Sequence, residues 1–248
     1  VARKVLNQAA CSEKPAVICF LGWKQTVAIP QPLRLAHTLE EAARLAAEFA
    51  GNPQRDAEAI LLPSVQRSFS PSQRFLRALF SGGTLCYEAQ VIWRSLLAVP
   101  VFSNAPLNPA QRLKDSNRSQ GHTAVDMGEE EFTVGRPHPM IDNDLRIRRL
   151  FQEARDPETA VVLLDVVLGY GAHPDPAAEL APAVQQACQI AKDAGRELLV
   201  VASVTGTDQD PQDLSRQVRE LERVGVVVCP SNASAARIAG MVVQAAKI

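Results

Sequence analysis

The amino-acid sequence predicts an α/β protein built on doubly wound parallel sheets. In the second half of its 248 residues, short apolar runs rich in β-branched residues alternate with segments whose apolar residues recur at helical spacing. The apolar runs are continuous, which is typical of strands buried on both faces. Glycine follows most of the helical segments, where a helix has to end. Regular alternation of strand and helix predicts a parallel sheet with right-handed crossovers.

The first fifty residues show the same alternation with elements missing. Residues 1–10 have the pattern of the end of a helix, residues 15–21 that of a strand, and residues 38–50 that of a helix. Thr38 with Glu41 three residues later is a capping-box pattern. One strand between two helices cannot form a core of its own. We therefore expect an incomplete domain, completed by residues of a longer chain or covered by another subunit.

The middle of the chain, up to Asp144, is rich in Pro, Ser, Asn and Arg, and residues 51–71 are interpreted as a linker. Three glutamates in a row, Glu129 to Glu131, predict a solvated turn. The elements expected here are a helix over 72–80, a helix over 85–97, an extended segment over 99–102, a loop over 112–121 and an edge or first strand over 122–127.

The second half contains the main predicted sheet. The run from Ala160 to Leu168 is rich in β-branched residues and stops at Gly169. The Asp210-Pro211 pair is a favoured helix start, with the acid as cap and proline in the first turn. We predict strands over 160–168, 197–204 and 226–229, and helices over 176–194, 210–224 and 232–246.

Composition excludes several classes of function. With 26 Lys and Arg against 27 Asp and Glu, the formal net charge of −1 argues against a nucleic-acid partner held by bulk charge. No apolar run is long enough to cross a bilayer, so no membrane partner is expected. The five cysteines form no C-x-x-C pair, which predicts neither a metal site nor a disulfide framework. We expect a cytoplasmic protein.

Candidate ligand-binding residues follow the ends of the predicted strands or precede helices. Glycines let the backbone approach a ligand, and free N–H groups at a helix start attract anions such as phosphate. Loops at the carboxyl ends of parallel strands face one crevice. The residues predicted to bind a small anionic substrate are Ser81, Gly82, Gly83, Thr84, Gly169, Tyr170, Gly171, His173, Thr205, Gly206 and Asn232.

The sharpest form of this hypothesis places the anion where Ser81–Thr84 meets Gly169–His173. His173 is the one candidate for a catalytic role, because a protonated ring adds a hydrogen-bond donor. The alternatives are structural. Gly82 could simply end a preceding helix, and Asp175 could cap the next helix while His173 is solvated.

A second loop, Gly135 to Asp142, holds Arg136 and His138 between prolines. The arginine could pair with a carboxylate or a phosphate, and a surface ion pair is the alternative. The sequence contains no Walker loop, no H-E-x-x-H pattern and no recognisable Ser/His/Asp arrangement.

Three stretches resemble the FdrA family, and the resemblance extends over nearly the whole chain. They are Arg77 to Ala89, Phe132 to Asp142, and Val161 to Ala177. FdrA proteins are related to the nucleoside-diphosphate-forming acyl-CoA synthetases, such as succinyl-CoA synthetase. The resemblance implies a flavodoxin-like fold used twice, with residues 1–50 as the end of an α-like ligase domain and residues 72–248 as a β-like CoA-ligase domain.

The chain also departs from the synthetases. They phosphorylate a histidine in a Gly-His-Ala loop after the strand that corresponds to Ala16–Leu21, and here the segment from Gly22 to Pro30 contains no histidine. His37 is the nearest one and is expected to be an ordinary surface residue. Val125 to Gly128 lies where the synthetases have a glycine-rich segment, and the glutamates that follow would repel phosphate. We predict that no histidine of this chain becomes a phosphoenzyme.

The resemblance implies an FdrA-type protein that acts on a small acyl or carbamoyl substrate, with oxamate carbamoyl transfer in allantoin or oxalurate breakdown as one possibility. Binding of CoA or a nucleotide would use domains that these residues do not contain. Homo-oligomers or companion subunits are expected, because ligase domains of the superfamily pack against each other. The alternative is a non-catalytic scaffold or regulatory subunit that keeps the ligase fold without the phosphohistidine.

Overall fold

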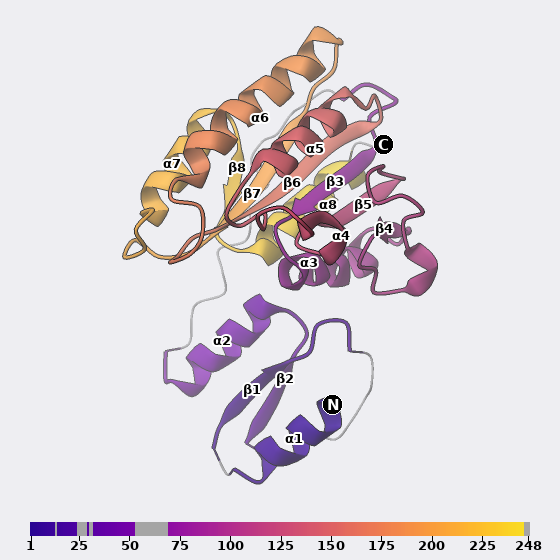
Figure 1. The fold of residues 1–248 in the computed structure, drawn as a ribbon. Helices are drawn as coiled ribbons and strands as arrows, with labels where there is room; N and C mark the ends of the chain where they lie inside the picture. The colour runs from indigo at the N-terminus through magenta and orange to yellow at the C-terminus, as the bar shows by residue number, and fades with distance from the viewer. Residues whose placement is uncertain (13, 24–28, 30–31, 53–68, 246–248) are drawn as a thin grey trace. The chain divides into compact units, whose positions relative to one another are not determined.

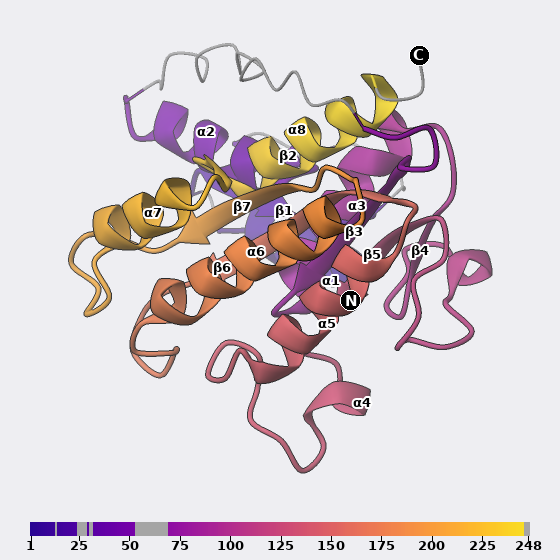
Figure 2. The same cartoon turned by 90° about the horizontal axis from the view of Figure 1, so that it is seen from above.

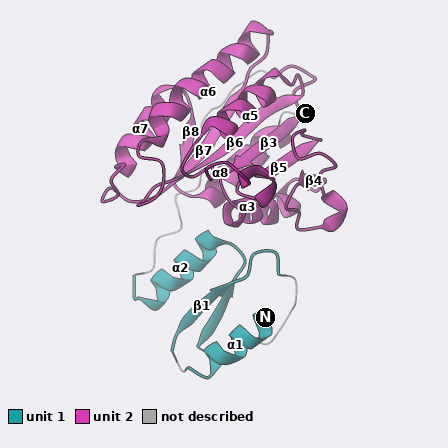
Figure 3. Cartoon of the chain, viewed as in Figure 1, with its two compact units in different colours: residues 1–63 teal, residues 64–248 magenta. Residues whose placement is uncertain are grey.

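The computed structural model describes residues 1–12, 14–23, 29, 32–52 and 69–245. The chain divides into two compact units, residues 1–63 and residues 64–248, shown in two colours in Figure 3. Each unit is described by itself.

Unit 1 is small, and its described residues contain two helices and two strands (Figure 1). It contains the helices α1 (Ala2–Ala10) and α2 (Leu39–Phe49) and the strands β1 (Ala16–Cys19) and β2 (Leu33–Ala36). The two strands are parallel, so the prediction of a lone strand in this region is wrong. Strand β2 was not predicted, because the charged Arg34 interrupts its apolar pattern.

The predicted cap of α2 is confirmed. The backbone N–H of Glu41 donates to Thr38 Oγ1 at 3.1 Å, and the N–H of His37 donates to Glu41 Oε2 at 2.7 Å. The core of the unit is small, because β1 is only half-buried along its length and Val5 and Phe49 are exposed.

Unit 2 contains a sheet of six parallel strands in the order β4-β5-β3-β6-β7-β8. This arrangement confirms the predicted α/β fold class with a doubly wound parallel sheet. The strands are β3 (Phe75–Phe80), β4 (Val101–Ser103), β5 (His122–Asp126), β6 (Thr159–Val167), β7 (Leu199–Thr205) and β8 (Val227–Cys229).

Helices cover both faces of the sheet, as Figure 2 shows. α3 (Gly83–Leu96) packs against α8 (Asn232–Ala245) on one face. The other face is covered by α5 (Asp144–Arg155), α6 (Pro176–Asp193) and α7 (Leu214–Arg223). Two short helices, η1 (Pro109–Gln111) and α4 (Glu130–Thr133), lie within loops. No helix in the described part of the chain is long and apolar enough to span a membrane.

The core lies between the sheet and its two helical layers. Residues 160–164 of β6 are completely or almost completely buried, as their continuous apolar sequence predicts. Trp93 of α3 is also buried, and its Nε1–H donates to the carbonyl of Ala236 in α8 at 2.7 Å. A Cβ at Gly240 would lie 2.6 Å from Leu96 Cδ2, so this glycine allows α8 to approach α3 closely.

Two elements of unit 2 differ from the sequence predictions, and both contain buried charged residues. Residues 75–80 form strand β3, and the predicted helix over 72–80 is wrong. Arg77, in the middle of β3, is buried against Glu153 and Asp156, with its nearest nitrogens 3.4 and 2.8 Å from their carboxylate oxygens. Helix α5 was not predicted, because three of its five buried residues are charged.

Two boundaries also differ from the predictions. Residues 122–126 form β5 between β4 and β3, so this strand is interior and not an edge. Helix α7 begins after Asp213, whose carboxylate accepts the N–H of Arg216 at 2.9 Å. The predicted cap, Asp210, instead closes a turn by accepting the N–H of Thr207 at 2.6 Å.

Candidate functional site

The connections of the sheet change face at the carboxyl end of β3, and we call the surface between this strand end and the loops after β5 and β6 the crevice. The loop after β3 leads to α3 on one face, whereas the loops after β5 and β6 lead to helices on the other face. Ligands of open parallel sheets bind where neighbouring connections diverge in this way. Leu79 pairs with Leu164, so β3 ends beside Asp165 while β6 continues for two more residues. β6 therefore rises about 7 Å above the end of β3 and forms a wall beside it.

The floor of the crevice is a buried polar network around Asp165. Ser81 donates twice to this carboxylate, from its backbone N–H at 2.7 Å and from its hydroxyl. Arg146 of α5 donates to the Asp165 carbonyl, and its guanidinium lies 3.5 Å from Asp165 Oδ1. All three residues are buried, so the Ser81 hydroxyl is held by Asp165 and does not face solvent. Burial lowers the pKa of Arg146, and the neighbouring Asp165 carboxylate opposes that shift.

Asp126, at the end of β5, stands beside this floor. The side-chain amide of Asn104 binds its backbone on both sides, donating to the Asp126 carbonyl at 2.8 Å and accepting the Asp126 N–H at 2.9 Å. Asp126 Oδ1 accepts the N–H of Gly128 at 2.9 Å, and no described residue donates to Oδ2. Burial raises the pKa of Asp126 to about 6; the Gly128 hydrogen bond opposes the shift, and the carboxylates of Glu129 and Asp165 add to it.

Two glycines leave room for the Asp126 carboxylate. A Cβ at Gly83 would lie 2.8 Å from Asp126 Oδ2. A Cβ at Gly128 would lie 2.7 Å from the carbonyl oxygen of Ser81 and 2.8 Å from His138 Nε2. Neither glycine has a positive φ, so both are needed for space rather than for backbone conformation.

His138 turns inward over Gly128. Its Nδ1 accepts the N–H of Met140 at 3.2 Å, which places the hydrogen of a neutral ring on Nε2. No described residue accepts from Nε2. Arg136, in the same loop, makes no ion pair with any described residue. It lines a separate outer cavity of about 320 Å³ with Pro137, Pro139, Asp142, Asp144, Leu145 and Arg148.

The first turn of α3 opens beside the crevice. The helix begins at Gly83, and its N-cap residue Gly82 is extended and offers no side chain to cap it. The first N–H groups of a helix have no partner within the helix, so here they are available to an anion. Because the preceding element is β3, this loop is a strand-to-helix connection, and Gly82 does not end a helix.

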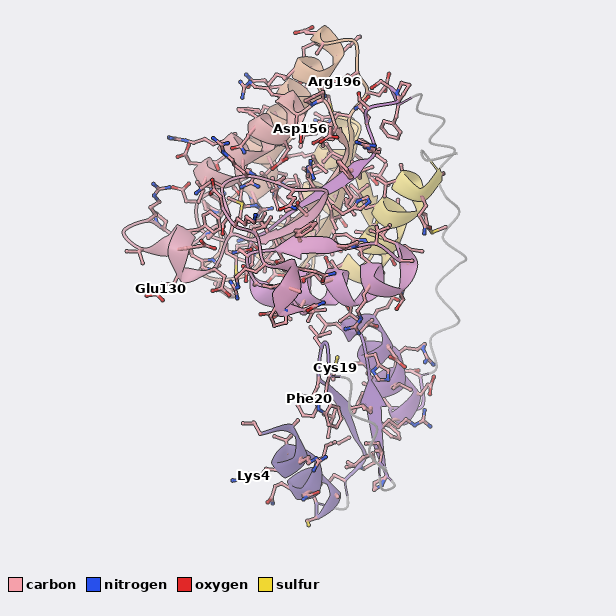
Figure 4. The ribbon with its side chains drawn as sticks, turned by 90° about the vertical axis from the view of Figure 1, so that its right-hand side faces the viewer. Lys4, Cys19, Phe20, Glu130, Asp156 and Arg196 are labelled. Carbon is pink, nitrogen blue, oxygen red and sulfur yellow. The ribbon has the colours of Figure 1, made fainter. Side chains whose placement is uncertain are left out.

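Glu129 to Glu131 are exposed, as the sequence predicts, but they lie at the start of a short helix and not in a simple turn. Residues 130–133 make the short helix α4, and the side chain of Glu130 points away from the unit (Figure 4). Glu131 instead turns back and accepts a hydrogen bond from the Asn104 amide at 3.0 Å.

The loop Gly169–His173 is held mainly from its outer side. The Gln212 side chain accepts the Gly169 N–H at 3.1 Å and donates to the Gly169 carbonyl at 2.9 Å. The N–H of His173 donates to the Met140 carbonyl at 2.8 Å, which joins this loop to the loop that carries His138. No hydrogen bond between described residues connects it to Ser81–Thr84.

The side chains of this loop point to different places. Tyr170 is 93% exposed. His173 Nδ1 accepts the N–H of Asp175 at 3.0 Å, and its Nε2 lies 3.2 Å from Glu179 Oε1. With Ile141, Asp142, Asp144, Ile147 and Glu179, His173 lines an open groove of about 460 Å³.

Asp175 takes the N-cap position of α6 but makes no capping hydrogen bond with its side chain. Its carboxylate instead accepts hydrogen bonds from Arg216 and Gln217, each at 2.9 Å. These bonds join the loop after β6 to helix α7.

The other predicted ligand-binding residues make structural contacts. The Thr205 carbonyl accepts the N–H of Leu168 at 2.9 Å, and a Cβ at Gly206 would lie 2.7 Å from the Leu168 Cβ. Asn232 faces α3, where its amide donates to the Leu85 carbonyl at 3.1 Å and to a Glu88 carboxylate oxygen at 2.8 Å.

Three residues of the site were missed by the sequence analysis. Asp126 lies within Val125 to Gly128, which corresponds to a glycine-rich segment of the synthetases, and the sequence predicts no role for the aspartate itself. Asn104 and Arg146 had no visible signal, because their partners lie 22 and 19 residues away. Within the described ranges, no cluster of His, Cys, Asp and Glu is arranged to hold a metal ion.

The comparisons with known proteins agree with the α/β fold. The CoA-ligase family matches residues 79–242, which include Ser81 and every strand-end loop that follows it. The chain is 41% identical over 249 residues to the uncharacterized protein YahF of Escherichia coli (strain K12). That alignment covers 96% of this chain and 47% of YahF, so the chain spans about half the length of this relative. With more than half of its length matched, the chain belongs to the CoA-ligase family.

Proposed function

We propose that this chain is the ligase-domain part of an FdrA-type protein that transfers a small acyl or carbamoyl group, with phosphate as one partner in the exchange. The observation that supports it best is the opening of the α3 N-terminus, without a side-chain cap, into the crevice of a CoA-ligase sheet. The oxygens of a phosphate or a carboxylate match such N–H donors. Oxamate and carbamoyl phosphate are small anions of this kind, and the reaction is placed in the cytoplasm.

The loops around the crevice supply complementary groups. The N–H groups of Gly83 and its neighbours lie at the positive end of the α3 dipole. His138 Nε2–H faces the same space from across Gly128. The Gly169–His173 loop follows β6, and of its backbone N–H groups those of Gly169, Ala172 and His173 already donate within the protein, which leaves Tyr170 and Gly171 as donors. CoA or a nucleotide, where the reaction needs one, would be bound by domains outside these residues.

The second candidate function is a scaffold or regulatory subunit. It is favoured by the absence of histidine from Gly22–Pro30, where the related synthetases have their phosphohistidine loop. The exposed carboxylate of Glu129, whose charge acts on Asp126, also opposes a phosphate dianion.

Turnover assays with the full chain separate the two functions. The protein is incubated with oxamate and carbamoyl phosphate, and separately with acetyl phosphate and CoA, alone and with candidate companion subunits. Phosphate release and ³¹P NMR follow the reaction, and thermal unfolding follows ligand binding. Turnover supports the transferase. The scaffold remains if no combination turns over and no ligand shifts the unfolding temperature.

Two variants test the place of the anion. Gly83→Val pushes a side chain into the space beside Asp126 Oδ2, so it is expected to weaken phosphate binding at least about tenfold, the equivalent of about 1.4 kcal/mol. His173→Ala is expected to weaken binding less than Gly83→Val, because its ring lines the neighbouring groove and lies against Glu179. Ala194→Val, exposed at the end of α6 on the opposite edge of the sheet, is the control. If Gly83→Val and His173→Ala both bind phosphate like the parent protein, the site assignment is wrong.

A further inference from the structure

We propose that Asp126 is the acid–base residue of this crevice and exchanges a proton with a ligand bound between Gly83 and Gly128. The inference rests on the proposed function, because it assigns to Asp126 a step in that group transfer. It adds a residue for which neither the sequence analysis nor the family likeness indicates a role.

Hydrogen bonds from neighbouring residues fix the position of Asp126. Asn104 binds both its backbone N–H and its carbonyl, so the residue cannot shift along the strand without breaking two buried hydrogen bonds. The N–H of Gly128 binds Oδ1 and orients the carboxylate. Such support from neighbouring groups is what a side chain needs to meet a substrate atom in a reproducible geometry.

One carboxylate oxygen remains free to act. Asp126 is 3% exposed, yet no described residue donates to Oδ2, and this atom lies beside the backbone of Gly83. A ligand oxygen or nitrogen that accepts from the first N–H groups of α3 is therefore brought next to Oδ2. Even a methyl side chain at Gly83 would occupy this position.

The surroundings of Asp126 contain more acidic than basic groups. No described cation pairs with it, since Arg112 binds the Asn104 carbonyl and Arg146 is bound to Asp165. Its carboxylate is therefore poised to take up a proton near neutral pH, as an acid–base catalyst must be. The titratable groups that face it are Cys86 and Tyr87 on α3, Glu129 after β5, Asp165 on β6, Glu131 on α4 and His138 on the following loop.

The step can be written for phosphate acting on an N-carbamoyl amide. A phosphate oxygen attacks the carbonyl carbon of the carbamoyl group and forms a C–O bond. The C–N bond to the amide nitrogen breaks, and that nitrogen takes up the proton of the Asp126 carboxylic acid. The resulting carboxylate then takes the proton that the phosphate hydroxyl loses. The products are carbamoyl phosphate and the free amide, and Asp126 returns to its starting state.

Asp126→Asn tests the role in two independent ways. The amide has the same shape and keeps an acceptor for the Gly128 N–H, so binding geometry is preserved. In the transfer reaction, kcat is expected to fall at least about 100-fold, the usual range for loss of a general acid or base, while the KM for phosphate is unchanged or lower. Asp193→Asn, exposed at the end of α6, is the matched control and is expected to keep the parent kcat.

The second readout needs no turnover. Sulfate keeps its charge between pH 5 and pH 8, so its affinity reports charges of the protein. Ionised Asp126 repels it, and the sulfate affinity of the parent protein is expected to fall at least about fivefold more across this range than that of Asp126→Asn. Both proteins are also compared in a His138→Gln background, which removes the ring that faces the same space.

The outcomes separate the two proposals. If the parent protein turns over and Asp126→Asn keeps kcat within threefold, the acid–base role is wrong and the transferase stands. If no substrate combination turns over, the proposed function fails, and the sulfate comparison alone decides whether Asp126 faces an anion site. The same pH dependence in both proteins, or no sulfate binding by the parent, overturns the inference. A merely structural role would lower kcat and thermal stability together.

Discussion

Asp126 is expected to destabilise the folded protein at neutral pH, and its replacement by Asn should remove that cost. Burial raises its pKa from 3.8 to about 6. Each unit of pKa corresponds to 1.36 kcal/mol, which gives about 3 kcal/mol in full, and the polar groups around a buried charge relax and screen part of it, so the cost is about 2 kcal/mol. We therefore expect Asp126→Asn to raise the free energy of unfolding at pH 8 by about 2 kcal/mol.

The pH dependence of this gain follows from the direction of the pKa shift. The folded protein keeps the Asp126 proton up to about pH 6, whereas the unfolded chain loses it near pH 3.8. Between these values the folded state binds more protons, so the stability contributed by Asp126 falls as the pH rises through this window. The advantage of Asp126→Asn should appear between pH 4 and pH 6, reach its full size above pH 6, and vanish below pH 4.

Urea unfolding from pH 4 to pH 8 measures the effect. Trp23 lies in unit 1 and Trp93 in unit 2, so a Trp23→Phe background makes fluorescence report unfolding around the site. The expected gain corresponds to an increase in Tm of about 4–8 °C for a unit of this size. Other carboxylates contribute equally to parent and variant, and Asp193→Asn shows the effect of removing an exposed carboxylate. Equal stability of parent and Asp126→Asn at pH 8 would refute the reasoning.

Four further outcomes are expected. Gly128→Ala should lower the free energy of unfolding by about 1–3 kcal/mol, because the new Cβ would lie 2.7 Å from the Ser81 carbonyl oxygen. In the same urea experiment, Gly82→Ala should change the free energy of unfolding by less than about 0.5 kcal/mol, because its Cβ would have no neighbour within 4 Å. Arg146→Met should cost about 3–5 kcal/mol by leaving Asp165 buried without its cation, and adding Asp165→Asn should recover part of that loss in a double-mutant cycle. Incubation with labelled ATP or acyl phosphate should give no acid-labile, base-stable label on this chain; such a label would show a phosphohistidine. Light scattering at micromolar concentration should give a mass larger than one chain of 26.8 kDa, and a single-chain mass would contradict the expected assembly.

The parts of the fold that the sequence predicted are those whose signal is local. Strand β6 is buried on both faces, so its own residues are almost all apolar, and a continuous run of that kind is visible without knowledge of its neighbours. The cap of α2 is equally local, because Thr38 and Glu41 are one helical turn apart. The strand-end loops could be placed at one edge because parallel strands all end on the same side.

The elements that were missed depend on pairs of charges that only the tertiary structure brings together. β3 contains Arg77 and α5 contains Arg149 and Glu153, and all three are buried. In the sequence, such residues indicate a solvated surface. In the fold, Glu153 lies 3.4 Å from Arg77 and accepts a hydrogen bond from Arg149, and Asp156 lies 2.8 Å from Arg77, so two carboxylates balance the two arginines inside the unit.

The features of the candidate site also divide into those visible in the sequence and those visible only in the tertiary structure. The sequence by itself determined that a glycine-containing loop, Ser81–Thr84, precedes a helix, whereas the strand before that loop, β3, was recognised only in the tertiary structure. Only the tertiary structure decided that Asp126 stands beside Gly83 and that Gly128 makes room for His138. Burial and neighbouring charge set the protonation of a carboxylate, and both are created by elements that are far apart in the chain. An aspartate at the end of a strand therefore becomes a candidate acid only once the sheet has closed around it.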